Sequence, residues 1–227
     1  MGRFVITGTG TDIGKTVFAA GLTGLIGADY WKPVQTGISC DVHARFMQLS
    51  RNVPAPDVPY LPQPGSDAEF VARMTGARIH PEAVILPEPL SPHRAAELAG
   101  VTIDPDELVP PGADRLVIEG AGGVLVPVTR DLLSAELFAR WDLPVILCAT
   151  TGLGTISHTL TALESLRARG CRVHGVAFIG DDNPDNIATI AALGAIRVLG
   201  RLPRLAPLDA DSLAAAMRAH FRAGDFQ

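Results

Sequence analysis

The stretch GTGTDIGKT, from Gly8 to Thr16, decides the fold of this chain. It ends in the Gly-Lys-Thr of a phosphate-binding loop, although five residues rather than the usual four separate Gly8 from Gly14. An apolar run rich in β-branched residues, 3–7, precedes it, and apolar residues at helical spacing follow it over 17–25. The sequence therefore predicts a strand, a glycine-rich loop and a helix in direct succession.

This context is the one in which a phosphate loop works. The N-terminus of a helix carries unpaired backbone N–H groups and partial positive charge, and both attract a phosphate. We expect Lys15 to reach the β- and γ-phosphates and Thr16 to offer its hydroxyl to Mg²⁺. The alternative is a glycine-rich turn that only joins a strand to a helix, but chance rarely places Gly-Lys-Thr where a helix should begin.

Composition limits the classes of protein that this chain can represent. The 227 residues are 47% hydrophobic and carry a formal charge of −5, which indicates a globular protein and argues against nonspecific binding of nucleic acid. Charged residues interrupt every apolar run before it reaches the roughly 18 residues that a membrane helix needs. We expect a cytoplasmic protein without a membrane partner. Its three cysteines show no metal-ligand spacing.

Strand and helix patterns alternate along the chain. Such alternation predicts a single-domain α/β fold over residues 1–227, with a mostly parallel sheet and helices on both faces, of the P-loop NTPase type. The segment 39–66 is rich in proline and is expected to be irregular. Expected strands span 3–7, 28–32, 116–118, 144–149, 173–179 and 197–199, and expected helices span 131–141, 156–169, 185–193 and 210–222.

Polar residues follow several of these strands, at the sheet edge where ligands of parallel α/β proteins collect. Lys32 ends the second strand immediately before Pro33, and we expect it to face the phosphate loop. Glu119 follows the third strand, where an acid opposite a phosphate loop suits a Mg²⁺ site. The fourth strand leads into a glycine turn at 150–157, which is either a second anion site or an ordinary connection.

Four motifs together resemble the dethiobiotin synthetase family, whose phosphate loop also has five residues between Gly and Gly-Lys-Thr. The first motif is that loop, and the second is the sequence KPVQTG of 32–37. The third is EGAGG of 119–123, and the fourth is LGTISH of 153–158. Two shorter stretches, 91–93 and 199–203, add support, so that the resemblance extends over most of the chain.

The resemblance implies an ATP- and Mg²⁺-dependent enzyme. In the family, 7,8-diaminopelargonate takes up CO₂ on one nitrogen as a carbamate, ATP phosphorylates the carbamate, and the second amine closes a cyclic urea. Lys32 and Lys15 are then the catalytic residues, and Thr36 binds the carbamate. The substrate's distal carboxylate binds at Thr155 and Ser157 of a neighbouring subunit, so a homodimer is implied.

The resemblance also implies the nucleotide and metal sites. Thr16, Glu119 and an aspartate hold Mg²⁺; Asp67 has the best flanking sequence for this role, and Asp41 is the alternative. The family's base-binding Asn-Asp is replaced by GDDN at 180–183, which leaves the preferred base open. The implied nucleotide contacts are Asp12, Ile13, Gly14, Lys15, Thr16, Val17, Glu119, Gly120, Ala121, Gly122, Pro203, Arg204 and Leu205.

Two other functions are alternatives to the synthetase. An amidotransferase-type synthase acting on a corrinoid acid usually carries a glutaminase domain, for which the chain has no room. A partition or positioning ATPase usually carries a second lysine early in its loop, and residues 9–11 supply none. The sequence favours the synthetase.

Overall fold

The computed structural model describes residues 2–38 and 60–227. Strand β1 (Gly2–Gly8) leads through the glycine-rich loop into helix α1 (Lys15–Ile26), as the sequence predicts. The strand is buried along nearly its whole length because strands lie on both sides of it and helices pack on both faces of the sheet. The phosphate loop therefore starts from the middle of the sheet.

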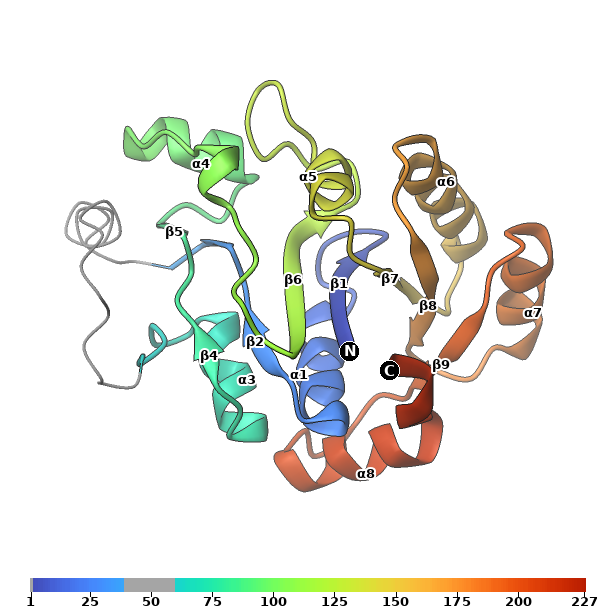
Figure 1. The fold of residues 1–227 in the computed structure, drawn as a ribbon. Helices are drawn as coiled ribbons and strands as arrows, with labels where there is room; N and C mark the ends of the chain where they lie inside the picture. Colours follow the sequence, from blue (N-terminus) through green and yellow to red (C-terminus); the bar gives the residue numbers. More distant parts are fainter. Residues whose placement is uncertain (1, 39–59) are drawn as a thin grey trace.

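The main sheet has seven strands in the order β4-β2-β6-β1-β7-β8-β9, and every pairing in it is parallel. Strands β6 and β7 flank β1, so the chain reverses its direction of winding at β1 (Figure 1). This is the position at which parallel α/β sheets bind ligands. The other strands are β2 (Asp29–Trp31), β4 (Ile79–His80), β6 (Arg115–Gly123), β7 (Val145–Thr150), β8 (Val173–Ile179) and β9 (Val198–Leu202).

Helices cover both faces of this sheet, which confirms the predicted architecture. One core cluster joins β1 to α1, α3 (Asp67–Thr75) and α8 (Ala210–His220). A second cluster joins the opposite face to α5 (Ser134–Trp141), α6 (Thr155–Ala168) and α7 (Pro184–Leu193). Apolar strands buried on both sides are the usual consequence of such layering.

A small second sheet was not predicted. Strands β3 (Val34–Thr36) and β5 (Val84–Leu86) pair in parallel, and helix α4 (Pro92–Ala99) packs against them. Each strand has three residues, too few for an alternating pattern to be read from the sequence. The short turns η1 (Pro105–Glu107) and η2 (Ala223–Phe226) complete the fold.

The predicted elements agree with the structure apart from their ends. The largest difference is β6, expected over 116–118, which continues to Gly123 and carries Glu119 inside the strand rather than beyond it. Residues 60–66 contain no helix or strand, as expected for the proline-rich segment. The rest of that segment, with the alternative metal ligand Asp41, lies outside the described residues.

Candidate active site

The phosphate loop curls because two of its residues adopt left-handed backbone conformations. Gly14 has φ +93° and precedes α1, and Asp12 has φ +54°. A glycine meets the first requirement without strain. Lys15 opens the helix, is 7% exposed, and donates a hydrogen bond of 2.6 Å from Nζ to the Gly10 carbonyl. Burial lowers the pKa of Lys15, whose ammonium is bound to a carbonyl of the loop itself.

Lys32 is delivered to the loop by the end of β2. Its side chain is buried, and Nζ forms ion pairs with Asp67 and, at 3.2 Å, with Glu119 Oε1. Burial by itself lowers the pKa of Lys32, but the carboxylates of Glu119 and Asp67 more than offset it, so that the pKa is raised. The ammonium is therefore charged over the whole physiological range.

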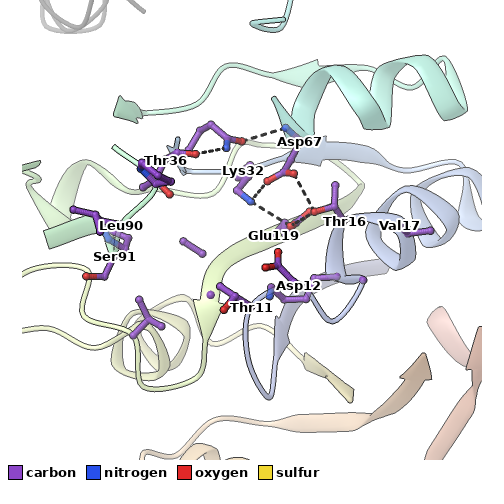
Figure 2. A pocket seen from close by; sticks show the side chains of 18 residues that line it. Thr11, Asp12, Thr16, Val17, Lys32, Thr36, Asp67, Leu90, Ser91 and Glu119 are labelled. Atoms are coloured by element: carbon purple, nitrogen blue, oxygen red, sulfur yellow. Dashed lines mark hydrogen bonds and ion pairs between the residues drawn. The ribbon is translucent and has the colours of Figure 1, made fainter. Parts of the chain in front are cut away.

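The residues expected to hold the metal converge at one point. The Thr16 hydroxyl lies 2.8 Å from Glu119 Oε1 and 3.1 Å from Asp67 Oδ1, and its single hydrogen bonds to one of them at a time. Figure 2 shows Thr16, Asp67, Glu119 and Lys32 joined in one network. One hydroxyl and two carboxylates are hard oxygen donors of the kind that Mg²⁺ binds beside a nucleotide's phosphates. Asp67, rather than a more distant acid, completes this set in the described part of the chain.

This network forms the floor of a cavity of about 890 Å³. Thr36 lies on its wall, on the far side of Lys32 from the phosphate loop (Figure 2). Residues 89–92, which lead into the start of α4, also line the cavity. The lining residues are Thr11, Asp12, Gly14, Lys15, Thr16, Val17, Lys32, Gln35, Thr36, Asp67, Pro89, Leu90, Ser91, Pro92, Glu119, Ala121, Gly122 and Val126.

Comparison with known proteins places this chain in a family. A protein-family model described as an AAA domain matches residues 2–212. An ATP-dependent dethiobiotin synthetase BioD of Sphingopyxis alaskensis is 48% identical over 227 residues, covering 100% of both chains. Another, of Bradyrhizobium sp., is 51% identical over 226 residues, covering 99% of this chain and 98% of its own. The chain belongs to the ATP-dependent dethiobiotin synthetase family.

Solved structures share the fold of this dethiobiotin synthetase family member at low identity. A ParA family ATPase from Chlorobium tepidum superposes with a TM-score of 0.53 at 10% identity, covering 96% of this chain and 91% of its own. The cell division ATPase MinD of Pyrococcus furiosus gives 0.51 at 15% identity, covering 96% and 99%. These likenesses confirm the P-loop NTPase-like fold and say nothing further about function.

A second cavity, of about 360 Å³, lies on the other side of the phosphate loop. Asp12 and Gly14 line both cavities, and Ile13 lines this one, so the loop separates them. Of the three residues expected at the base, Arg204 lines the second cavity, whereas Leu205 packs against the core and Pro203 is not part of the lining. Its other lining residues are Thr150, Thr151, Gly152, Ile179, Gly180, Asp181, Asp182 and Asn183.

The expected carboxylate-binding residues lie apart from the first cavity within this one chain. Thr155 begins α6, is 1% exposed, and donates from its hydroxyl to the Thr150 carbonyl at 2.5 Å. Ser157 is exposed on the first turn of that helix, and neither residue lines the cavity around Lys32. Gly120 is also absent from that lining, and a side chain there would meet Phe138, since a Cβ would lie 2.7 Å from Cζ.

Sequence reasoning missed two polar residues in this site. Tyr30 donates from its hydroxyl to Glu119 Oε2 at 2.8 Å, and Gln35 accepts from the backbone N–H of Asp67 at 3.2 Å. Burial and then the Glu119 charge raise the pKa of Tyr30 well above its usual value, so the phenol remains a donor. A tyrosine inside an apolar strand reads as a core residue, and Gln35 gave no signal except its place in the KPVQTG motif.

Cys148 and His93 line neither of these two cavities. Cys148 is buried in β7 and burial raises the pKa of its thiol, which suits a residue that packs in the core. His93 is the second residue of α4, with Nδ1 3.1 Å from the Ser91 hydroxyl. Among the residues that the structure describes, none of the helices combines the length and apolarity that crossing a bilayer requires.

Proposed function

We propose that this chain catalyses the ATP- and Mg²⁺-dependent closure of 7,8-diaminopelargonate and CO₂ to dethiobiotin, with release of ADP and phosphate. The observation that carries the proposal is the position of Lys32, buried between Asp67 and Glu119 on the floor of a cavity that it shares with Lys15. This arrangement supports a reaction in which two anionic groups must meet. Family membership supports the identity of the substrates.

ATP would bind across the phosphate loop, with its phosphates at the loop and its base in the second cavity. The backbone N–H groups at the start of α1 and the Lys15 ammonium would hold the phosphates. To reach a phosphate, Lys15 must give up its hydrogen bond to the Gly10 carbonyl. The base would then lie in the second cavity, beside Arg204.

The oxygen donors of Thr16, Asp67 and Glu119 would hold Mg²⁺ against the nucleotide. When bound, the ion screens the phosphate charge and orients the γ-phosphoryl group. Groups of three or more His, Cys, Asp or Glu side chains able to hold a metal do not occur in the described ranges 2–38 and 60–227. Mg²⁺ sites of nucleotide enzymes use one or two carboxylates and complete the coordination with phosphates and water.

Lys32 and Thr36 would act on the carbamate. One amine of the substrate attacks CO₂ and loses a proton, and a carbamate oxygen then displaces ADP from the γ-phosphorus. Two unit charges 4 Å apart repel by about 1 kcal/mol in water and about 4 kcal/mol at an effective dielectric constant near 20. The Lys32 ammonium would offset this repulsion, while the Thr36 hydroxyl would orient the carbamate.

Ring closure completes the reaction. The second amine attacks the carbonyl carbon of the phosphorylated carbamate, the C–O bond to phosphate breaks, and the nitrogen loses a proton to give the cyclic urea. Phosphate leaves as a dianion beside Lys15 and Lys32, whose positive charge stabilises it. Both lysines would thus stabilise negative charge twice, first during phosphoryl transfer to the carbamate and then during release of phosphate.

We further propose a homodimer in which the start of α6 from a second subunit binds the distal carboxylate of the substrate. Leu153 and Ser157 are exposed at this surface, so a second subunit can reach them. Gly154, with φ +88°, allows the sharp turn that opens the helix, whose N-terminus would attract a carboxylate. Thr155 would contribute by holding this turn to the end of β7.

ADP release measures the proposed reaction directly. We expect ADP and phosphate to appear in equal amounts only when 7,8-diaminopelargonate, bicarbonate, ATP and Mg²⁺ are all present. A vicinal diamine of the same length without the distal carboxylate should react with a KM raised at least tenfold, since it lacks the contact with α6. ATP hydrolysis at the same rate with diamine and bicarbonate omitted would contradict the synthetase and favour a nucleotide switch.

A further inference from the structure

The two oxygens of the Glu119 carboxylate face different surroundings. Oε1 accepts from Thr16 at 2.8 Å and pairs with Lys32 at 3.2 Å, so it faces the cavity. Oε2 faces the core and accepts from the Tyr30 hydroxyl at 2.8 Å. Glu119 is 1% exposed, and Thr16, Lys32 and Tyr30 are hydrogen-bond partners of its two oxygens. The rotation of the carboxylate therefore depends on these side chains.

We propose that Tyr30 is a positioning residue that fixes the Glu119 carboxylate for the metal of the nucleotide complex. This inference rests on the proposed function, because it concerns the metal that Glu119 would hold. Tyr30 is fully buried and does not line the cavity, so it can act on the reaction only through Glu119. None of the four family motifs includes it.

Packing makes Tyr30 a rigid donor. Its ring lies in the core cluster formed with α1 and α3, and its strand is held between β6 and β4. The backbone at Tyr30 pairs with Val117, two residues before Glu119 on the neighbouring strand. Since both side chains rise from adjacent strands, the phenol cannot follow Glu119 if the carboxylate rotates. The hydrogen bond thus selects one rotation of the carboxylate, with Oε1 toward Thr16.

The neutrality of the phenol matters as much as its position. Lys32 also contacts Glu119, but as a cation it repels a divalent ion at the same oxygen. Tyr30 holds the carboxylate without cancelling its charge, which leaves that charge available to the metal. Hydrogen-bond partners of metal ligands typically change metal affinity by roughly 10- to 100-fold when they are removed. A buried carboxylate oxygen that loses its donor is especially unfavourable.

The test compares Tyr30→Phe with Tyr60→Phe. The Tyr60 hydroxyl also donates to a buried carboxylate, that of Glu82, which does not line the cavity. Binding of Mn²⁺ to the full-length enzyme with ADP can be followed by electron paramagnetic resonance of the free ion. We expect Tyr30→Phe to raise the Mn²⁺ dissociation constant about tenfold or more, and Tyr60→Phe to leave it within twofold. The rate of Tyr30→Phe should recover at high Mg²⁺.

A double-mutant cycle separates positioning from a general loss of structure. If Tyr30 acts through Glu119, Tyr30→Phe will not weaken Mn²⁺ binding further in a Glu119→Gln background. Equal weakening in both backgrounds, or an unchanged Mn²⁺ dissociation constant for Tyr30→Phe in an enzyme that makes dethiobiotin, would overturn the role of Tyr30 alone. Failure of the wild-type enzyme to make dethiobiotin would instead overturn the proposed function.

Discussion

At the scale of single residues, Lys32 occupies the place where the charges of the site meet. Its ammonium pairs with the same carboxylates, Asp67 and Glu119, that would hold Mg²⁺. A divalent ion at those oxygens repels the ammonium, and the open direction for Lys32 is the cavity that it lines. Metal binding would thus favour the orientation in which Lys32 can reach the carbamate.

Replacing Lys32 separates its catalytic role from its role as a counter-ion. We expect Lys32→Met to lower kcat on the order of 10²–10³-fold, as removal of a charge-stabilising donor does. ADP binding should stay within a few-fold of wild type, because the loop and Lys15 hold the phosphates. Mn²⁺ binding without nucleotide should become tighter, since two carboxylates lose their resident cation. Stopped-time ADP assays and calorimetric titrations provide these values; nucleotide affinity falling in parallel with kcat would contradict the assignment.

Single residues were also the scale at which the sequence was most informative. Gly-Lys-Thr, Lys32 and Glu119 were identified because motif spacing and strand ends constrain them. Only the flanking residues favour Asp67 over Asp41 in the sequence, and the structure brings Asp67 to Thr16. Tyr30 could not be identified, because its role depends on which strand lies beside β2, and strand order is not encoded locally.

At the scale of elements, helix α3 places Asp67, the carboxylate that we propose as a metal ligand. Its N-cap, Ser66, accepts from the Glu69 N–H at 3.1 Å, and Asp67 is its first residue. Gln35 accepts from the Asp67 N–H, which links the start of the helix to β3. The sequence indicated helical character after Asp67, but it could not show β3 and β5, whose three residues each carry no periodic signal.

Weakening this N-cap should affect the metal site as well as stability. We expect Ser66→Ala to lower the free energy of unfolding by about 1 kcal/mol and to raise the Mg²⁺ concentration for half-maximal rate several-fold, because the first turn carries Asp67. Asp209 caps α8 through the Ser212 N–H at 2.8 Å, so Asp209→Ala is the matched control. It should lower the melting temperature and leave the Mg²⁺ requirement unchanged; a shift of that requirement in both variants would mean that general stability, not α3, sets it.

The cap of α8 also predicts a dependence of stability on pH. The Ser212 backbone N–H holds the pKa of Asp209 below its ordinary value. A depressed folded-state pKa stabilises the protein above the unfolded-state pKa, and that stabilisation is lost as pH falls through the folded-state value. Melting temperatures of wild type and Asp209→Ala should therefore differ fully at pH 7 and converge below about pH 4. A constant difference from pH 7 to pH 3 would exclude the carboxylate as the cause.

At the scale of the whole molecule, the site depends on a sheet whose centre is β1. The fold class followed from the alternation of apolar runs and helical patterns, since parallel strands buried on both faces leave continuous apolar stretches. The strand order β4-β2-β6-β1-β7-β8-β9 did not follow, because it is set by contacts between segments far apart in sequence. That order brings Tyr30, Glu119 and the phosphate loop together from three adjacent strands.

The first and last residues of the chain lie near each other at the start of β1, at the end of the strands opposite the site (Figure 1). The Phe226 side chain is 1% exposed and meets Phe4 of β1 edge-on, with ring centroids 5.9 Å apart. His174 Nε2 lies 2.7 Å from the Asp225 carbonyl, which ties β8 to the same turn. The last residues thus complete the core beneath β1 rather than trailing from the fold.

Removing the Phe226 ring should therefore destabilise the whole molecule without changing its chemistry. We expect Phe226→Ala to lower the free energy of unfolding by about 3–5 kcal/mol, as for other buried phenylalanines, while KM for ATP and kcat at 25 °C stay within twofold of wild type. Urea titrations give the first value and ADP-release assays the others. Deletion of Gln227 alone, which is exposed, is the control and should change neither. A KM for ATP that rises with the loss of stability would show that β1 transmits the state of the chain ends to the phosphate loop.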